Sequence, residues 1–142
     1  PSEPVTLDFD STLVEVYGRK KPGAARAHTG QLAYQPLLGV WAERGRVLAA
    51  ELLSGSDSTR ADDTLEMVRR TLSLLPAGHG HLGARFDAGF YRIELLRMLR
   101  EKGVSFSISV PRSSAMWRAL ERIDDEQWQE AIDFPDAEVA ET

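Results

Sequence analysis

Cysteine is absent from the 142 residues, which excludes disulfide bonds and thiolate metal sites. The chain also lacks an apolar run long enough to span a bilayer, so we expect no membrane contact. Neither an internal repeat nor a low-complexity tract is present. An initiator methionine and a signal-like segment are missing as well, so we interpret the chain as a piece of a longer protein. What remains is an ordinary globular composition with 42% hydrophobic residues, enough for a single core.

Basic residues are missing from the C-terminal segment beyond Arg122, and this absence hides a positive charge elsewhere. The whole chain carries a net charge of −5, but residues 1–122 hold 14 acids against all 17 bases. Segment 19–28 contains four bases and no acid, a pattern that can bind phosphate groups and that also suits a solvated loop. The four bases are Arg19, Lys20, Lys21 and Arg26.

The clearest pattern in the chain is the alternating stretch from Val5 to Val16, which predicts a strand. Its apolar residues fall on one face, and Thr6, Asp8 and Asp10 fall on the other. A carboxylate held rigidly at the tip of a strand suits a hard divalent cation, which prefers oxygen ligands. The segment therefore predicts chemistry on metal ions or phosphates.

The order of the remaining patterns predicts an α/β fold with a mixed sheet, β-β-β-α-β-α-β. After a basic loop over residues 19–30, we expect a hairpin, a helix, a strand, a second helix, a strand, and a short helical segment. The hairpin covers 32–41 and 47–53, and the two helices cover 59–75 and 91–102. The two later strands cover 82–86 and 104–110, and the short helical segment covers 113–122. Residues 1–122 are thus predicted to form one core. Residues 123–142 are predicted to be the acidic start of a following module, without a complete element of its own.

Two acidic residues come at strand ends, Asp10 after the first strand and Asp87 after the fourth. If these strands are neighbours, both side chains meet at one edge of the sheet, where open α/β sheets place their sites. Together they could hold one or two Mg²⁺ ions acting on a phosphodiester. Alternatively, Asp10 is a turn residue, and Asp87 opens a turn or caps the second helix.

Three motifs along the chain resemble the catalytic core of bacterial insertion-sequence DDE transposases, which belong to the ribonuclease-H-like superfamily. They are DFDST (8–12), HTGQLAYQPLLG (28–39) and RFDAGFY (85–91), in the order of that family. The resemblance implies a ribonuclease-H-like fold, with Asp10 and Asp87 as the first two catalytic and metal-binding acids. The family's third acid is a Glu on a later helix, to which no glutamate here corresponds. A chain of this extent is therefore expected to be inactive alone.

The same resemblance implies Mg²⁺ (or Mn²⁺) as cofactor, hydrolysis at the ends of the element, and attack of the freed 3′-hydroxyl on target DNA. Its implied partner is double-stranded DNA, both transposon ends and target, bound by a homo-oligomer. It further implies a cytoplasmic, nucleoid-associated protein. In this setting the four bases of segment 19–28 are expected to contact the DNA backbone.

Two other interpretations stay open on the sequence. The hexapeptide DFDSTL (8–13) also resembles the first motif of haloacid-dehalogenase-type phosphatases, with Asp8 as nucleophile and Asp10 as general acid. Against it, Lys102 is the sole lysine beyond Lys21, and the acidic pair at 124–125 follows no predicted strand. The third interpretation is a non-catalytic remnant that binds DNA.

Overall fold

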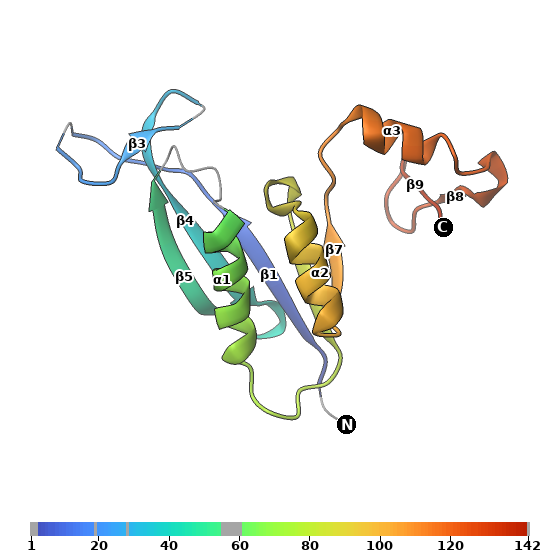
Figure 1. The fold of residues 1–142 in the computed structure, drawn as a ribbon, viewed down its shortest axis with the longest axis horizontal. Helices are drawn as coiled ribbons and strands as arrows, with labels where there is room; N and C mark the ends of the chain where they lie inside the picture. Colours follow the sequence, from blue (N-terminus) through green and yellow to red (C-terminus); the bar gives the residue numbers. More distant parts are fainter. Residues whose placement is uncertain (1–2, 19, 28, 55–60, 142) are drawn as a thin grey trace. The chain divides into compact units, whose positions relative to one another are not determined.

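The computed structural model describes residues 3–18, 20–27, 29–54 and 61–141. The chain forms two compact units, Pro1–Ser109 and Val110–Thr142 (Figure 1). The first unit holds the main sheet and two helices. The predicted domain boundary at Arg122 falls inside the second unit and stays a prediction.

Within the described residues, the first unit is built on a mixed seven-stranded sheet. β1 is central: it pairs antiparallel with β4 and parallel with β6. β4 also pairs antiparallel with β5, and β6 pairs parallel with β7. This order confirms the predicted hairpin, and it makes the first and fourth strands neighbours, which was the condition for a shared site of Asp10 and Asp87. The strands are β1 (Val5–Ser11), β2 (Val14–Glu15), β3 (Ala25–Arg26), β4 (Leu32–Trp41), β5 (Arg46–Ser54), β6 (Leu82–Phe86) and β7 (Ser105–Ile108).

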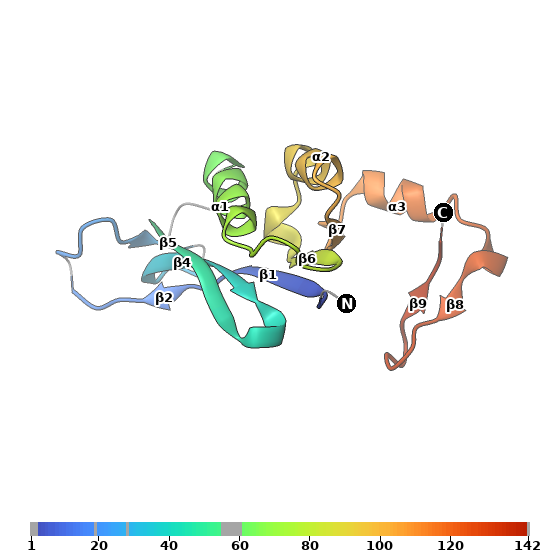
Figure 2. The ribbon, with the colours of Figure 1, turned by 90° about the horizontal axis from the view of Figure 1, so that it is seen from below.

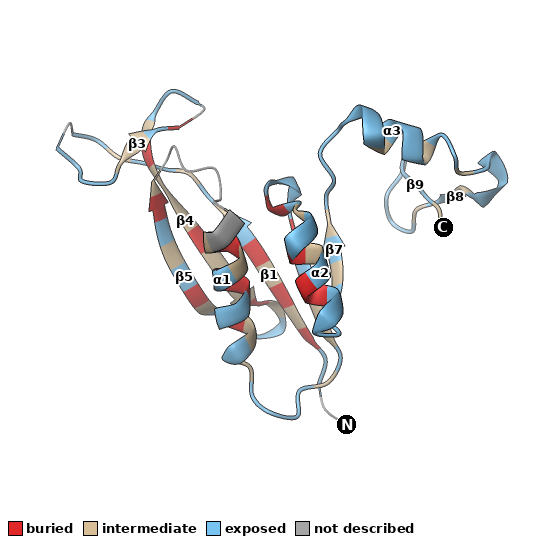
Figure 3. Cartoon of the chain, in the orientation of Figure 1, coloured by how far each residue is buried: buried red, intermediate tan, exposed pale blue. Residues whose placement is uncertain are grey.

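Two amphipathic helices, α1 (Ala61–Ser73) and α2 (Ile93–Glu101), cover the same face of this sheet (Figure 2). The alternating apolar residues of β1 are buried under them, as are the inward residues of both helices (Figure 3). The core includes Val5, Leu7, Phe9, Met67, Val68, Leu95, Met98 and Leu99. No helix in the described part of the chain is long and apolar enough to cross a membrane.

Helix α1 approaches the sheet closely at Gly39 of β4. A Cβ atom at this position would lie 2.6 Å from Thr71 Oγ1 and 3.1 Å from the Phe9 ring. Glycine therefore suits this approach, because a larger residue would require the side chains of Thr71 or Phe9 to move.

The first predicted strand is shorter than its pattern suggested. β1 ends at Ser11, and β2 resumes the pairing with β4 two residues later. The interruption faces Pro36 of β4. The Pro36 carbonyl accepts a hydrogen bond from Thr12 N at 3.2 Å, but Pro36 has no N–H to donate in return, so one hydrogen bond of the strand pairing is missing there. The expectation of a plain loop over 19–30 is also wrong, because β3 (Ala25–Arg26) pairs there with β4.

Two short 3₁₀ helices complete the first unit. η1 (Ala42–Arg44) joins β4 to β5, and η2 (Ala88–Phe90) follows β6, where a sharp turn was predicted. The helix α2 then ends at Glu101, and Gly103 follows with a φ of 67°, a conformation that glycine commonly supplies after a helix. The sequence also predicts Thr59 as the N-cap of the first helix, and this residue lies outside the described ones.

The second unit contains more structure than its acidic composition predicted. α3 (Ser114–Leu120), expected from the sequence, is capped by Ser113, whose Oγ accepts from Met116 N at 3.1 Å. It is followed by η3 (Asp125–Gln127) and by the antiparallel pair β8 (Gln129–Glu130) and β9 (Glu138–Val139). The expectation that 123–142 lacks a complete element is therefore wrong. Asp133 and Asp136 adopt positive φ, which aspartate tolerates, and so allow the chain to turn between β8 and β9.

Candidate functional site

The parallel pairing of β1 with β6 brings the two predicted acids to the same end of the sheet. Phe9 pairs with Phe86, and Asp10 and Asp87 are the next residues on the two neighbouring strands. The backbone of Asp87 is still extended, with φ −81° and ψ 177°, so the strand geometry continues through it. Because side chains alternate along a strand, both carboxylates belong to the sheet face opposite the helices.

Each of the two carboxylates is exposed and has one oxygen held by a backbone amide. Asp10 Oδ1 accepts a hydrogen bond from Ser11 N at 2.8 Å, and Asp87 Oδ1 accepts one from Gly89 N at 2.9 Å. Asp87 thus opens the turn formed by η2, as one alternative predicted, and does not cap the second helix, whose N-cap is Arg92. Within the described residues, the second oxygen of each carboxylate has no hydrogen-bond partner and neither group is in an ion pair. Both are accessible to a ligand.

Three aromatic side chains, Phe9, Phe86 and Phe90, pack together beneath this end of the sheet, and we call them the aromatic floor. The rings of Phe9 and Phe86 stack with centroids 4.9 Å apart, and Phe86 and Phe90 meet at 5.7 Å with a 48° tilt. Phe9 and Phe86 directly precede Asp10 and Asp87, so the buried rings anchor the backbone from which both acids project.

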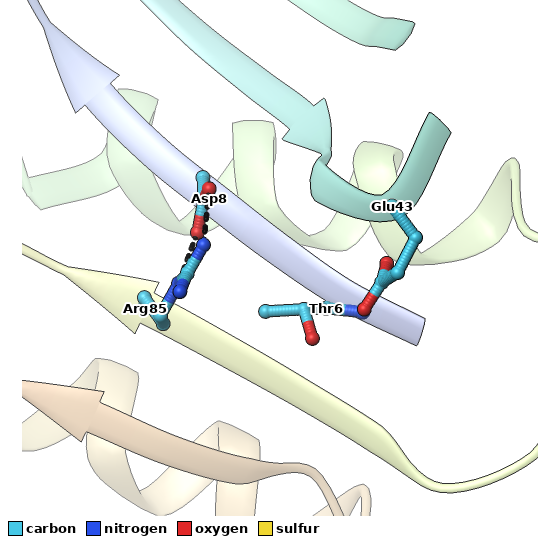
Figure 4. A network of polar contacts seen from close by, with 4 residues as sticks. All are labelled: Thr6, Asp8, Glu43 and Arg85. Atoms are coloured by element: carbon cyan, nitrogen blue, oxygen red, sulfur yellow. Dashed lines mark hydrogen bonds and ion pairs between the residues drawn. The ribbon is translucent and has the colours of Figure 1, made fainter. Parts of the chain in front are cut away.

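Asp8 and Arg85 form a bidentate ion pair two residues before the carboxylates, across the same two strands (Figure 4). Arg85 Nε donates to Asp8 Oδ1 at 2.6 Å, and Nη2 donates to Oδ2 at 2.7 Å. These hydrogen bonds, and secondly the charge of Asp8, raise the pKa of Arg85. Because Asp8 shares the polar face of Asp10, the sequence allows two roles for it, an auxiliary metal ligand or a residue that orients its neighbours through hydrogen bonds, and the second is the one we predict. Arg85 was not recognised, because its contact with Asp8 depends on the register of the two strands as well as on their order.

A second polar contact lies near the start of β1, away from the two acids (Figure 4). Thr6 N donates to Glu43 Oε2 at 3.0 Å, tying η1 to the strand. Hydrogen bonds from the Thr6 side chain and backbone lower the pKa of the Glu43 carboxyl. This contact holds the opposite end of β1 and has no part in the carboxylate site.

The basic segment extends from the same end of the sheet as Asp10. β4 runs antiparallel to β1, and the segment enters β4 at Leu32, several residues before Leu38, the register partner of Asp10. Lys20, Lys21 and Arg26 are exposed there, and Arg26 Nη1 donates to the Gly30 carbonyl at 2.8 Å. Arg19, the fourth predicted base, lies outside the described residues, as does His28.

The oxygen ligands available at this end of the sheet meet only part of what a hard cation needs. No group of three or more His, Asp or Glu side chains that could hold a metal ion is found in the ranges that the structure describes. Two carboxylates match what Mg²⁺ commonly takes from a protein, because it keeps several waters or takes substrate phosphate oxygens as its other ligands. Asp10 and Asp87 could therefore supply only part of a magnesium ligand set, and other groups would have to supply the rest.

Comparison with known proteins places the chain in a family. No curated protein sequence matches it. Among solved structures, the piggyBac transposase synaptic complex with hairpin DNA is 13% identical, with a TM-score of 0.60 over 84% of this chain. The Mos1 transposase paired-end complex is 11% identical, with a TM-score of 0.49 over 77% of this chain. The chain spans 26% of the piggyBac chain and 35% of the Mos1 chain.

The likeness to piggyBac shows a shared ribonuclease-H-like fold, in agreement with the predicted strand order. Residues 1–141 match the family described as transposase DDE domain, group 1. Because this match covers nearly the whole chain, the protein belongs to the transposase DDE domain group 1 family.

Proposed function

We propose that this chain contributes two metal-binding catalytic acids, Asp10 and Asp87, to a nuclease and strand transferase that cleaves and rejoins DNA at insertion-sequence ends. The observation that carries the proposal is the parallel register of β1 and β6, which gives both acids the same sheet end and the same face. Membership of the DDE transposase family supports it independently.

In this proposal, Asp10 and Asp87 hold Mg²⁺ or Mn²⁺ with the oxygens that the backbone leaves free. A divalent ion there would lower the pKa of an attacking water and stabilise negative charge on the phosphoryl oxygens. The amides of Ser11 and Gly89 fix the other oxygen of each acid, so little reorganisation is needed when a ligand arrives. Hydrolysis joins a water oxygen to phosphorus and breaks the P–O3′ bond. The released 3′-hydroxyl then attacks a phosphorus of target DNA, so that a new P–O3′ bond forms, the P–O3′ bond of the target strand breaks, and the target strand leaves with a free 3′-hydroxyl that takes up the proton.

We further propose double-stranded DNA, transposon ends and target, as the partner of the complete protein, bound by more than one copy. The piggyBac complex contains hairpin DNA, and Lys20, Lys21 and Arg26 are exposed bases on the chain that connects β2 to β4. No third acid is assigned in this chain, so we expect it not to cleave DNA by itself.

The phosphatase alternative requires Asp8 as a free nucleophile. Both oxygens of Asp8 instead accept hydrogen bonds from Arg85, which stabilises the carboxylate and reduces its nucleophilicity. We therefore expect no hydrolysis of a small phosphoester, and an Asp8→Asn variant that lost such an activity would revive this alternative.

Titration of the 142-residue chain with Mn²⁺ tests the proposed site directly. Paramagnetic broadening in NMR spectra should affect the amide signals of Asp10 and Asp87 together, because one ion would lie near both. Asp10→Asn should abolish the broadening at both positions, whereas Glu66→Gln, an exposed acid on α1, should change nothing. Broadening at one acid alone, or an unaltered response in Asp10→Asn, would contradict the shared site.

Replacing Lys20 and Lys21 with Ala should weaken DNA binding irrespective of base sequence. Each backbone contact releases counterions, so the slope of log K against log salt concentration should become shallower by about two. Fluorescence anisotropy with a short duplex at several salt concentrations measures this slope. The matched control is Arg100→Ala with Lys102→Ala, two exposed bases at the end of α2. Equal slopes for the two double variants would exclude a special role for the segment.

A further inference from the structure

Asp8 and Arg85 form an ion pair across the two strands that carry the proposed metal ligands, two residues before each ligand. Asp8 and Arg85 are direct register partners, and Asp10 and Asp87 each follow two residues later on the same face. Both members of the pair are partly exposed, with 37% and 60% of their side-chain surface accessible. The pair is thus a side-chain cross-link between β1 and β6, placed beside the carboxylates.

Two carboxylates on the ends of neighbouring strands repel each other when no cation lies between them. The repulsion favours separation of the strand ends, where few backbone hydrogen bonds oppose it. A bidentate pair of opposite charges across the same strands opposes this separation, because both its hydrogen bonds require the native register. The side chains of Asp8 and Arg85 can therefore preserve the spacing of Asp10 and Asp87 before a metal ion binds.

We propose that Arg85 is a positioning residue for the metal site at Asp10 and Asp87, acting through its paired hydrogen bonds to Asp8. This inference rests on the proposed function, since it concerns the same two acids. Arg85 and Asp8 do not touch the ion. They maintain the distance between the two strands that carry its ligands, as residues behind a metal site commonly do.

Charge alone predicts a different outcome from positioning, which makes the proposal testable. If only charge mattered, removing Arg85 would make the site more negative and strengthen cation binding, whereas neutralising Asp8 would weaken it. If the pair positions the strands, both single changes weaken binding. The double change Asp8→Asn with Arg85→Met leaves the net charge unaltered and removes the cross-link, so it isolates the positioning effect.

The experiment measures Mn²⁺ affinity by paramagnetic NMR broadening in the wild-type chain, the two single variants and the charge-neutral double variant. We expect weaker binding in all three variants, by about threefold to fivefold in the double variant, the range of a well-oriented exposed ion pair. In the metal-free form of these variants, hydrogen exchange at the amides of Ser11 and Gly89 should be faster than in the wild type, because these amides bind the two carboxylates. The control is Glu66→Gln with Arg69→Met, which removes an exposed ion pair on α1.

Wild-type affinity in the charge-neutral double variant would overturn the proposal, as would tighter binding by Arg85→Met. A loss of affinity in the α1 control of the same size would overturn it too. Failure of the proposed function gives a different result: the wild-type chain would then show no broadening that depends on Asp10. Circular dichroism of each variant ensures that the comparison is made between folded chains.

Discussion

Asp10→Asn and Asp87→Asn, each introduced into the complete gene product, should lower DNA cleavage at transposon ends by at least about a thousandfold. The reason is that asparagine has the shape of aspartate but lacks the negative charge that holds a divalent cation. A bound metal ion contributes several kcal/mol to the stabilisation of a phosphoryl-transfer transition state, and loss of either ligand removes much of this. The measurement is single-turnover cleavage of a labelled transposon end at saturating protein.

The substitution Asp87→Asn also separates the two roles considered for Asp87, the cap of η2 and the proposed metal ligand. The side-chain oxygen of asparagine can still accept the hydrogen bond from Gly89 N, so the cap of η2 is retained in Asp87→Asn. Asp87→Ala removes both the cap and the charge. Cleavage that survives in Asp87→Asn and fails in Asp87→Ala would show that the residue is a cap and not a metal ligand. Asp63→Asn, on α1, provides a control for the general effect of losing one acid.

The sheet could be predicted because its strands have strong local patterns. Alternation identified β1, and the polar turn between two apolar runs identified the β4–β5 hairpin. The pairing of the first strand with the fourth was only a condition of the shared site, and the structure shows that β1 and β6 do pair, in parallel. β3 was missed because two residues carry too little pattern to predict a strand. The break between β1 and β2 depends on Pro36, whose partner in the sheet cannot be read from the local sequence.

The two acids of the candidate site could be predicted from the sequence, but the ion pair of Asp8 with Arg85 beside them could not. Asp10 and Asp87 each directly follow an apolar strand residue, so a rule about strand ends could find them. The contact of Asp8 with Arg85 joins positions 77 residues apart, and its recognition requires the register as well as the strand order. The hairpin of the second unit was missed because the acidic composition masked the turn at Asp133 and Asp136.

The aromatic floor of the site leads to the prediction with the largest effect on stability, Phe90→Ala. The Phe90 side chain is fully buried and its ring contacts that of Phe86. Removing a buried aromatic ring costs the free energy of its transfer from water and leaves a cavity, about 3–5 kcal/mol in all. A domain of this size has about 5–15 kcal/mol of stability, so the variant should unfold at a much lower urea concentration. Urea denaturation followed by circular dichroism measures the change.

Ile93→Ala is the matched control for Phe90→Ala, because Ile93 lies three residues further along with 52% of its surface exposed. We expect its free energy of unfolding to stay within about 0.5 kcal/mol of the wild type. Phe90→Leu fills most of the cavity and should cost less than Phe90→Ala. If the floor also supports the acids, the folded fraction of Phe90→Leu should bind Mn²⁺ more weakly than Ile93→Ala does. Equal stability of Phe90→Ala and Ile93→Ala would mean that the turn after Asp87 does not pack on the core.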